Sequence, residues 1–218
     1  MFVGHLSLAL AAKRWEPDVN LGWLMAGVTA LDLVWPIFVL AGIEKVSIAP
    51  GASAFTPLAF DSYPWSHSLA MTFVWGLLLV TIARFFKVPS TAWTLLAALV
   101  LSHWALDAVT HNPDMPIWPG DGPKVGLGLW NSIPATFAVE GAMWVAGIAI
   151  YVMTLAKRNQ RASWLFWSFI VVCTAMWVAS PYTAPPPDAR TVAMFGLVGW
   201  IVLPWAALAD RRGASQRG

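Results

Sequence analysis

The chain has 218 residues, of which 58% are hydrophobic and 11% are charged, and its formal net charge is +2. Soluble domains carry roughly 25% charged residues, so this composition argues against a water-soluble globule and indicates a protein that lies in hydrocarbon. No basic run is dense enough to indicate nucleic-acid binding, and a single cysteine, Cys173, excludes an intrachain disulfide.

The elements predicted along the chain are all helices. The stretch Phe2–Ala12 is apolar but short, and Lys13 and Arg14 follow it, the reverse of a signal peptide. We therefore expect it to form a half-span or steeply buried helix of the mature fold. Six further apolar stretches are long enough, at about 20 residues, to cross a bilayer. They are Leu21–Ile43, Ser66–Phe86, Thr91–Thr110, Ile133–Ala156, Ser163–Ser180 and Thr191–Leu208.

These stretches predict an all-α fold, a polytopic transmembrane helical bundle with about six spans plus the short N-terminal membrane helix. Residues 1–155 contain the candidate site residues and are expected to form a membrane-embedded metal-site domain. Residues 156–210 contain two spans without ionisable residues in their interiors, which indicates a scaffold. Residues 211–218 are expected to form a cytoplasmic tail.

Lysine and arginine are unevenly divided between the two ends of this bundle. If the helices alternate in direction, ten of the 13 fall at one end, and only Lys45, Lys124 and Arg190 fall at the other. Positive residues are enriched on the cytoplasmic side of membrane proteins. We therefore expect the N-terminus outside, the C-terminus inside, and the longer loops 44–65 and 111–131 on the outer face.

Ionisable side chains inside a membrane are costly and usually functional. His103 and Asp107 are four residues apart, so they share a helix face and can offer nitrogen and oxygen ligands to one zinc ion. His111 continues this face if the helix extends that far. The alternative is a local hydrogen bond between His103 and Asp107 that only holds helices together.

Three more candidate ligands lie on other segments. Asp32 is mid-span, and Pro36 removes the helical partner of its carbonyl, so a cation or a buried water is expected nearby. His67 is predicted at the outer start of its helix, with Ser66 as the cap, unless it is an interfacial histidine that faces water. His5 lies in the short first helix. At about 1.5 Å per residue these groups differ in depth, so a tilted helix or a dipping loop must bring them together.

Glu140 and the loop before it supply the remaining candidates. A buried carboxylate is either a ligand, a general base or a protonated group bonded to a neighbouring helix. Asn131 and Ser132 are candidate caps of the following helix, whose N-terminus attracts anions. We therefore expect Lys124, Asn131 and His111 to bind substrate, unless this loop is an ordinary glycine-rich turn.

Four motifs follow one another in the chain: Gly4-His5-Leu6-Ser7, Asp32, Trp65-Ser66-His67-Ser68, and Ser102-His103 with Asp107. In this order they resemble the YdjM-like bacterial membrane-bound metal-dependent hydrolases. The resemblance covers residues 1–155 and implies a helical protein of the bacterial inner membrane. The family usually shows a His-Arg-x-x-Thr-His-Ser run, and the segment around His67 lacks the first His and the Arg, which indicates a divergent subfamily.

Together these inferences predict a membrane-embedded metal-dependent hydrolase acting on a lipid or phosphoester substrate reached from the outer face. One or two divalent ions, most simply zinc, are expected to be held by His5, Asp32, His67, His103 and Asp107. Asp107 and Glu140 are expected to act in catalysis by moving protons. The alternatives are a haem-binding electron-transfer protein, a proton-coupled transporter and a non-catalytic membrane subunit.

Overall fold

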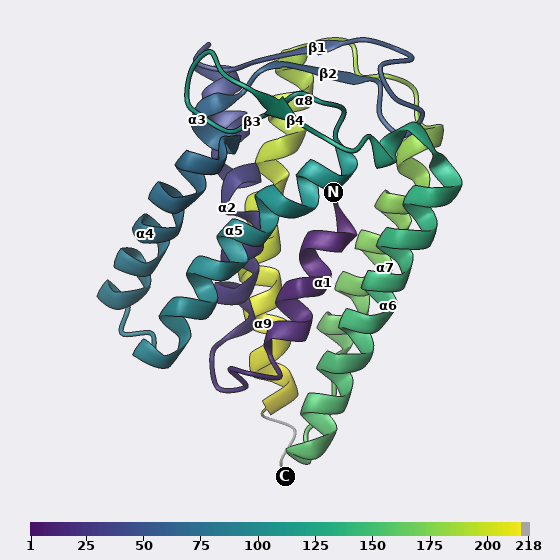
Figure 1. Cartoon of the computed structure of the whole chain (residues 1–218). Coiled ribbons are helices and arrows are strands. Elements are labelled where there is room, and N and C mark those ends of the chain that lie inside the picture. The colour runs from purple at the N-terminus through teal and green to yellow at the C-terminus, as the bar shows by residue number, and fades with distance from the viewer. Residues whose placement is uncertain (215–218) are drawn as a thin grey trace.

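The structure, a computed structural model, describes the backbone of residues 1–214 and the side chains as far as residue 210. It is a bundle of helices with short strands gathered at one end (Figure 1). The helices are α1 (Val3–Ala12), α2 (Leu21–Leu40), α3 (Pro64–His67), α4 (Leu69–Phe85), α5 (Trp93–Thr110), α6 (Ile133–Lys157), α7 (Trp164–Ala179), α8 (Ala189–Gly196) and α9 (Val202–Ala214).

The predicted all-α membrane bundle is confirmed. Among the described residues, five helical segments are long and apolar enough to cross a membrane. They are Leu21–Leu40, Ser90–Thr110, Ile133–Lys157, Trp164–Tyr182 and Ala189–Asp210. The last combines α8 and α9 through a short 3-10 turn, Leu197–Ile201. Helix α4 is apolar but has 17 residues, one turn less than a usual span.

Two small antiparallel pairs of strands cover one end of the bundle, and the sequence patterns did not predict them. Strand β1 (Lys45–Ile48) pairs with β2 (Leu58–Ser62), and β3 (Met115–Pro116) pairs with β4 (Lys124–Val125). The turn between α4 and α5 and the end of α6 lie at the opposite end (Figure 1). The basic residues of those segments are thus separated from Lys45 and Lys124, as expected.

One sequence interpretation, the cap assigned to Ser66, needs correction. Ser66 does not cap the helix after it, because Pro64 starts the separate turn α3, and the hydroxyl of Ser68 caps α4 by accepting from the Met71 amide. Lys13, counted among the cytoplasmic charges, is only 4% exposed. Of the predicted tail, residues 211–214 continue α9, and residues 215–218 lie outside the described residues.

Helix α1 is the short, buried element that we expected. It begins part-way down the bundle and packs most extensively against α6 (Figure 1). The two helices approach closely at Gly147, where an added Cβ would lie 2.6 Å from the backbone oxygen of Ser7. This contact sets the position of α1 and therefore of His5, which lies in the first turn of that helix.

The Gly147→Ala variant is expected to lose about 1–3 kcal/mol of stability, because the new methyl group overpacks a backbone contact. Thermal unfolding of the purified protein in detergent measures this loss. Gly76→Ala is the matched control, since its Cβ would lie 3.7 Å from Ala97, at ordinary contact distance. Equal melting temperatures for both variants would contradict the close α1–α6 contact.

Candidate metal centre

Five ionisable residues predicted as ligands meet in the interior of the bundle. They come from four helices: His5 from α1, Asp32 from α2, His67 from α3, and His103 and Asp107 from α5. Counting residues along the helices had placed the candidate ligands at different depths in the membrane. The turn α3 brings His67 inward to the depth of the others. All except Asp32 are buried, and its side chain is 52% exposed.

Four side-chain atoms of this cluster lie at the spacing of ligands around one ion. His103 Nε2 is 3.0 Å from Asp107 Oδ2 and 3.7 Å from Asp32 Oδ1. His67 Nε2 is 3.5 Å from the same Asp32 oxygen and 3.9 Å from the same Asp107 oxygen. Tetrahedral zinc with bonds of about 2.0–2.1 Å needs ligand separations of about 3.3–3.4 Å. The observed distances bracket this value.

The nitrogen of His103 that faces this point has no hydrogen-bond partner among the described residues, although it is buried. Its approach to Asp107 is short, but it does not have hydrogen-bond geometry. An unpaired buried nitrogen between two carboxylates is costly unless a further partner is present. A divalent cation satisfies the nitrogen and both carboxylates together, so the residues fit a metal ion.

Hydrogen bonds behind the cluster fix the orientation of two rings. His103 Nδ1 lies 2.6 Å from the carbonyl oxygen of Val28, which can only accept, so Nδ1 carries the proton. His67 Nδ1 lies 2.7 Å from Ser66 Oγ, whose hydroxyl donates to Glu44 Oε2 at 2.6 Å. Both Nε2 atoms are therefore free to bind a metal, and the second chain ends on a carboxylate, as is common behind metal ligands.

Glu44 was not among the predicted site residues. It is 1% exposed and also accepts from the amides of Trp65 and Ser66, at 2.8 Å each. These three bonds hold the turn α3 that presents His67. In the sequence, Glu44 is simply an acidic residue directly after an apolar span. Such residues are common at the ends of spans, so the sequence does not single it out.

The Glu44→Gln variant is expected to weaken metal binding by about 10–100-fold, because its NH2 replaces one of the two acceptor oxygens and cannot accept from the Ser66 hydroxyl while the remaining oxygen accepts from the two amides. Competition with a chelator of known affinity measures this change. Asp61→Asn is the matched control, since Asp61 is exposed and accepts only from Ser47 Oγ in the described hydrogen bonds. If both variants bind metal equally, Glu44 has no role in orienting the ligand.

His5 has a different relation to the cluster. Its Nε2 is 2.9 Å from Asp107 Oδ1, and its ring stacks on that of His103 with centroids 3.8 Å apart and planes 6° apart. The Met1 amino group lies 2.5 Å from the same oxygen. A metal ion binds in the plane of an imidazole ring, so parallel stacked rings do not both face one ion. His5, which we expected to be a ligand, is therefore placed to orient Asp107 through its Oδ1 atom.

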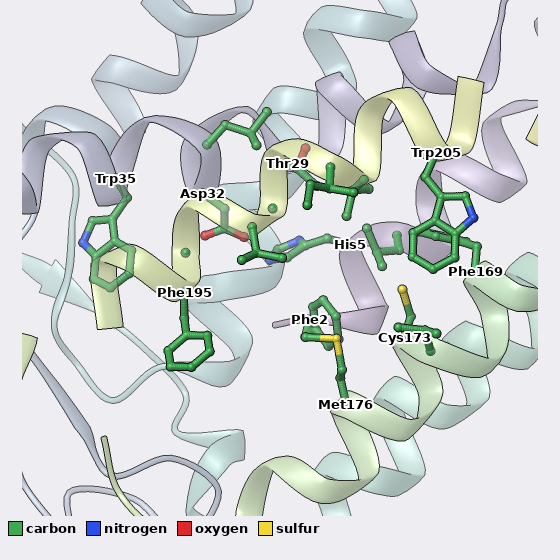
Figure 2. A pocket seen from close by; sticks show the side chains of 18 residues that line it. Phe2, His5, Thr29, Asp32, Trp35, Phe169, Cys173, Met176, Phe195 and Trp205 are labelled. Carbon is green, nitrogen blue, oxygen red and sulfur yellow. The ribbon is translucent and has the colours of Figure 1, made fainter. Parts of the chain in front are cut away.

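Two cavities meet at the cluster. The first, of about 200 Å³, contains Asp32, His67, Asp107 and His111 in its wall, and we call it the polar cavity. The second, of about 300 Å³, has a mainly apolar wall from α2, α7, α8 and α9, and we call it the apolar cavity. Figure 2 shows Asp32 and His5 among the apolar side chains of this second cavity. The half-exposed carboxylate of Asp32 lines both.

The expectation that His111 continues the face of His103 is wrong. Helix α5 ends at Thr110, and His111 has extended backbone, with φ −68° and ψ 153°. Its Nδ1 lies 3.0 Å from Asp114 Oδ1, which also accepts from the Tyr63 hydroxyl. Burial, with Asp114 adjacent, raises the pKa of Tyr63, so this hydroxyl remains a donor at any ordinary pH. His111 still reaches the polar cavity, by a different route.

The structure does not bring three other predicted site residues to the two cavities: Lys124, Asn131 and Glu140. Lys124 is exposed in β4, and the Asn131 side-chain amide donates to Asn112. Ser132 caps α6, as expected. Glu140 accepts from the amides of Phe2 and Gly4 at 3.0 and 3.3 Å and thereby binds the start of α1. It lines neither cavity at the cluster.

Comparison of the chain with protein-family models, with curated proteins and with solved structures finds no match. The resemblance to the YdjM-like family therefore stays a prediction from motifs.

Proposed function

We propose that this chain is a membrane-embedded hydrolase that uses a divalent metal ion, most simply zinc. Asp32, His67, His103 and Asp107 would hold the ion. The observation that carries this proposal is that the Nε2 atoms of His67 and His103 each lie 3.0–3.9 Å from one oxygen of Asp32 and one of Asp107, while the buried His103 Nε2 has no hydrogen bond among the described residues. The substrate would be a lipid or phosphoester that reaches the polar cavity from the outer face of a bacterial inner membrane.

The residues around the ion have separate tasks in hydrolysis. When bound, zinc would supply Lewis acidity, and a water that joined these four ligands would become nucleophilic near neutral pH. Asp32 would bind the ion through one carboxylate oxygen, and because its carboxylate is open to both cavities, the second oxygen can accept a proton from water and return it to the leaving oxygen. His5 holds Asp107 through its other oxygen. Water thus places its hydroxyl on phosphorus or an acyl carbon and its proton on the leaving oxygen.

Two features favour hydrolysis over the alternatives. Haem needs axial histidines but no carboxylates, whereas two carboxylates lie between the imidazoles here. A proton-coupled transporter is usually built from repeats around its central site, and the chain shows none. The polar cavity also gives water and substrate access to the candidate ligands.

The proposal is tested by activity of the purified full chain on nitrophenyl phosphodiesters and nitrophenyl esters. Chelation is expected to abolish turnover, and added zinc to restore it. Asp32→Asn is expected to reduce turnover by at least ~100-fold, as loss of a general base does. Asp61→Asn should leave it unchanged. Hydrolysis of these substrates that persists after chelation and in Asp32→Asn would overturn the proposal. Proton-coupled flux in proteoliposomes without any hydrolysis would also overturn it.

A further inference from the structure

The apolar cavity opens sideways, toward the hydrocarbon around the bundle. Its rim includes Met176 of α7, Phe195 of α8 and Ile201 before α9, which are 56%, 71% and 56% exposed. These are apolar side chains on spans, so in a bilayer they face lipid chains. The mouth therefore lies between α7 and the α8–α9 segment (Figure 2).

The inner end of this cavity is the only strongly polar part of its described wall. His5 and Asp32 lie there, while the hydroxyl of Thr29 is already bonded to the carbonyl of Met25. Phe2, Asp32 and Trp35 line both cavities and so form the junction between them. A ligand that fills both must be apolar along one part and polar beyond Asp32.

The size of the apolar cavity suits a hydrocarbon chain. A methylene group is about as large as a water molecule, ~30 Å³, so 300 Å³ accommodates on the order of ten methylenes. A methylene group gains free energy by apolar transfer when it leaves water. An acyl chain that comes from the bilayer is already in hydrocarbon and gains little of this free energy. Binding of the chain in the cavity therefore serves to position the head group.

We propose that the apolar cavity binds one acyl chain of a membrane lipid, which enters from the bilayer between α7 and the α8–α9 segment. This inference rests on the proposed function and deepens it. The bond next to the chain then lies at Asp32, beside the four metal-binding atoms, and the head group occupies the polar cavity. Hydrolysis there adds a hydroxyl to the phosphorus or acyl carbon of the lipid and a proton to the oxygen that leaves.

The test is photo-crosslinking in vesicles of phosphatidylglycerol that carries a diazirine on one acyl chain, with mass spectrometry to find the labelled residues. Labelling is expected at Phe169 and Cys173, which line the cavity and are only 1% and 4% exposed. Val172→Trp should fill part of the cavity and reduce this labelling by on the order of tenfold, because the larger side chain overpacks the space that the acyl chain needs. Val171→Trp is the matched control, because Val171 precedes it on the same helix, is 65% exposed and does not line the cavity.

This experiment distinguishes failure of the acyl-chain proposal from failure of the hydrolase proposal. Cavity labelling needs no turnover, so it should persist after chelation and in His103→Ala. Labelling only at lipid-facing positions, or equal labelling of Val172→Trp and Val171→Trp, would overturn the acyl-chain proposal even if soluble nitrophenyl esters are hydrolysed. Cavity labelling without metal-dependent turnover of any ester would support the acyl-chain site and would overturn the proposal that the protein is a hydrolase.

Discussion

Replacing His103 with alanine is expected to abolish stoichiometric metal binding. The side chain is 0% exposed, and its Nε2 lies between the oxygens of Asp32 and Asp107. Loss of a direct ligand should exceed the ~10–100-fold effect of outer hydrogen-bond partners. Elemental analysis of detergent-purified protein, prepared without chelators, measures the metal content of wild type and variant.

The Asp32→Asn variant keeps this prediction testable if His103→Ala folds poorly. Asp32 is 52% exposed on its side chain, so the loss of its charge should cost the fold little. It should nevertheless lower metal affinity by at least ~100-fold, because an amide is a weak zinc ligand. Asp61→Asn should retain full metal content. Retention of metal by both site variants would show that the ion binds elsewhere.

The second large effect is expected at the opposite end of α1. The Lys13 ammonium donates to Asp210 Oδ2 at 2.7 Å and to the carbonyls of Pro17 and Val19. Lys13→Met leaves the carboxylate of Asp210 buried without its cation, which typically costs about 3–5 kcal/mol. At about 2–4 °C per kcal/mol, the melting temperature should fall by on the order of 10 °C.

A double variant separates the effect of the unpaired Asp210 charge from the effect of changed packing at Lys13. Asp210 also accepts from the Leu21 amide and the Tyr151 hydroxyl, and an asparagine keeps its oxygen for the Leu21 amide while the Tyr151 hydroxyl can turn to accept from its NH2. Lys13→Met with Asp210→Asn should therefore recover much of the lost stability. If the double variant melts no higher than Lys13→Met alone, the buried ion pair does not account for the loss.

The sequence predicted the elements that hydrophobicity specifies. Apolar stretches and the short N-terminal segment became helices close to their expected ranges, because a bilayer leaves few other structures for such residues. Asp32, His67, His103 and Asp107 were singled out because ionisable groups inside spans are rare. Their convergence, however, depends on the turn α3 and on the α1–α6 contact at Gly147, which periodicity does not encode.

The polar loops were harder to predict. Glu44 was missed because an acid after a span looks like any interfacial charge, whereas here it binds the turn that carries His67. Lys124 and Asn131 were chosen for charge and capping type, and the strand pair β3–β4 places Lys124 at the surface. Glu140 was chosen for its burial, and that burial accompanies hydrogen bonds to the start of α1.

X-ray absorption at the zinc edge of the full-length protein in detergent tests the central claim most directly. The geometry predicts about one zinc per chain, bound by nitrogen and oxygen at about 2.0–2.1 Å, with the outer-shell scattering of two imidazoles. His103→Ala should remove that signal. A sulfur shell near 2.3 Å, or a zinc environment unchanged in His103→Ala, would contradict it.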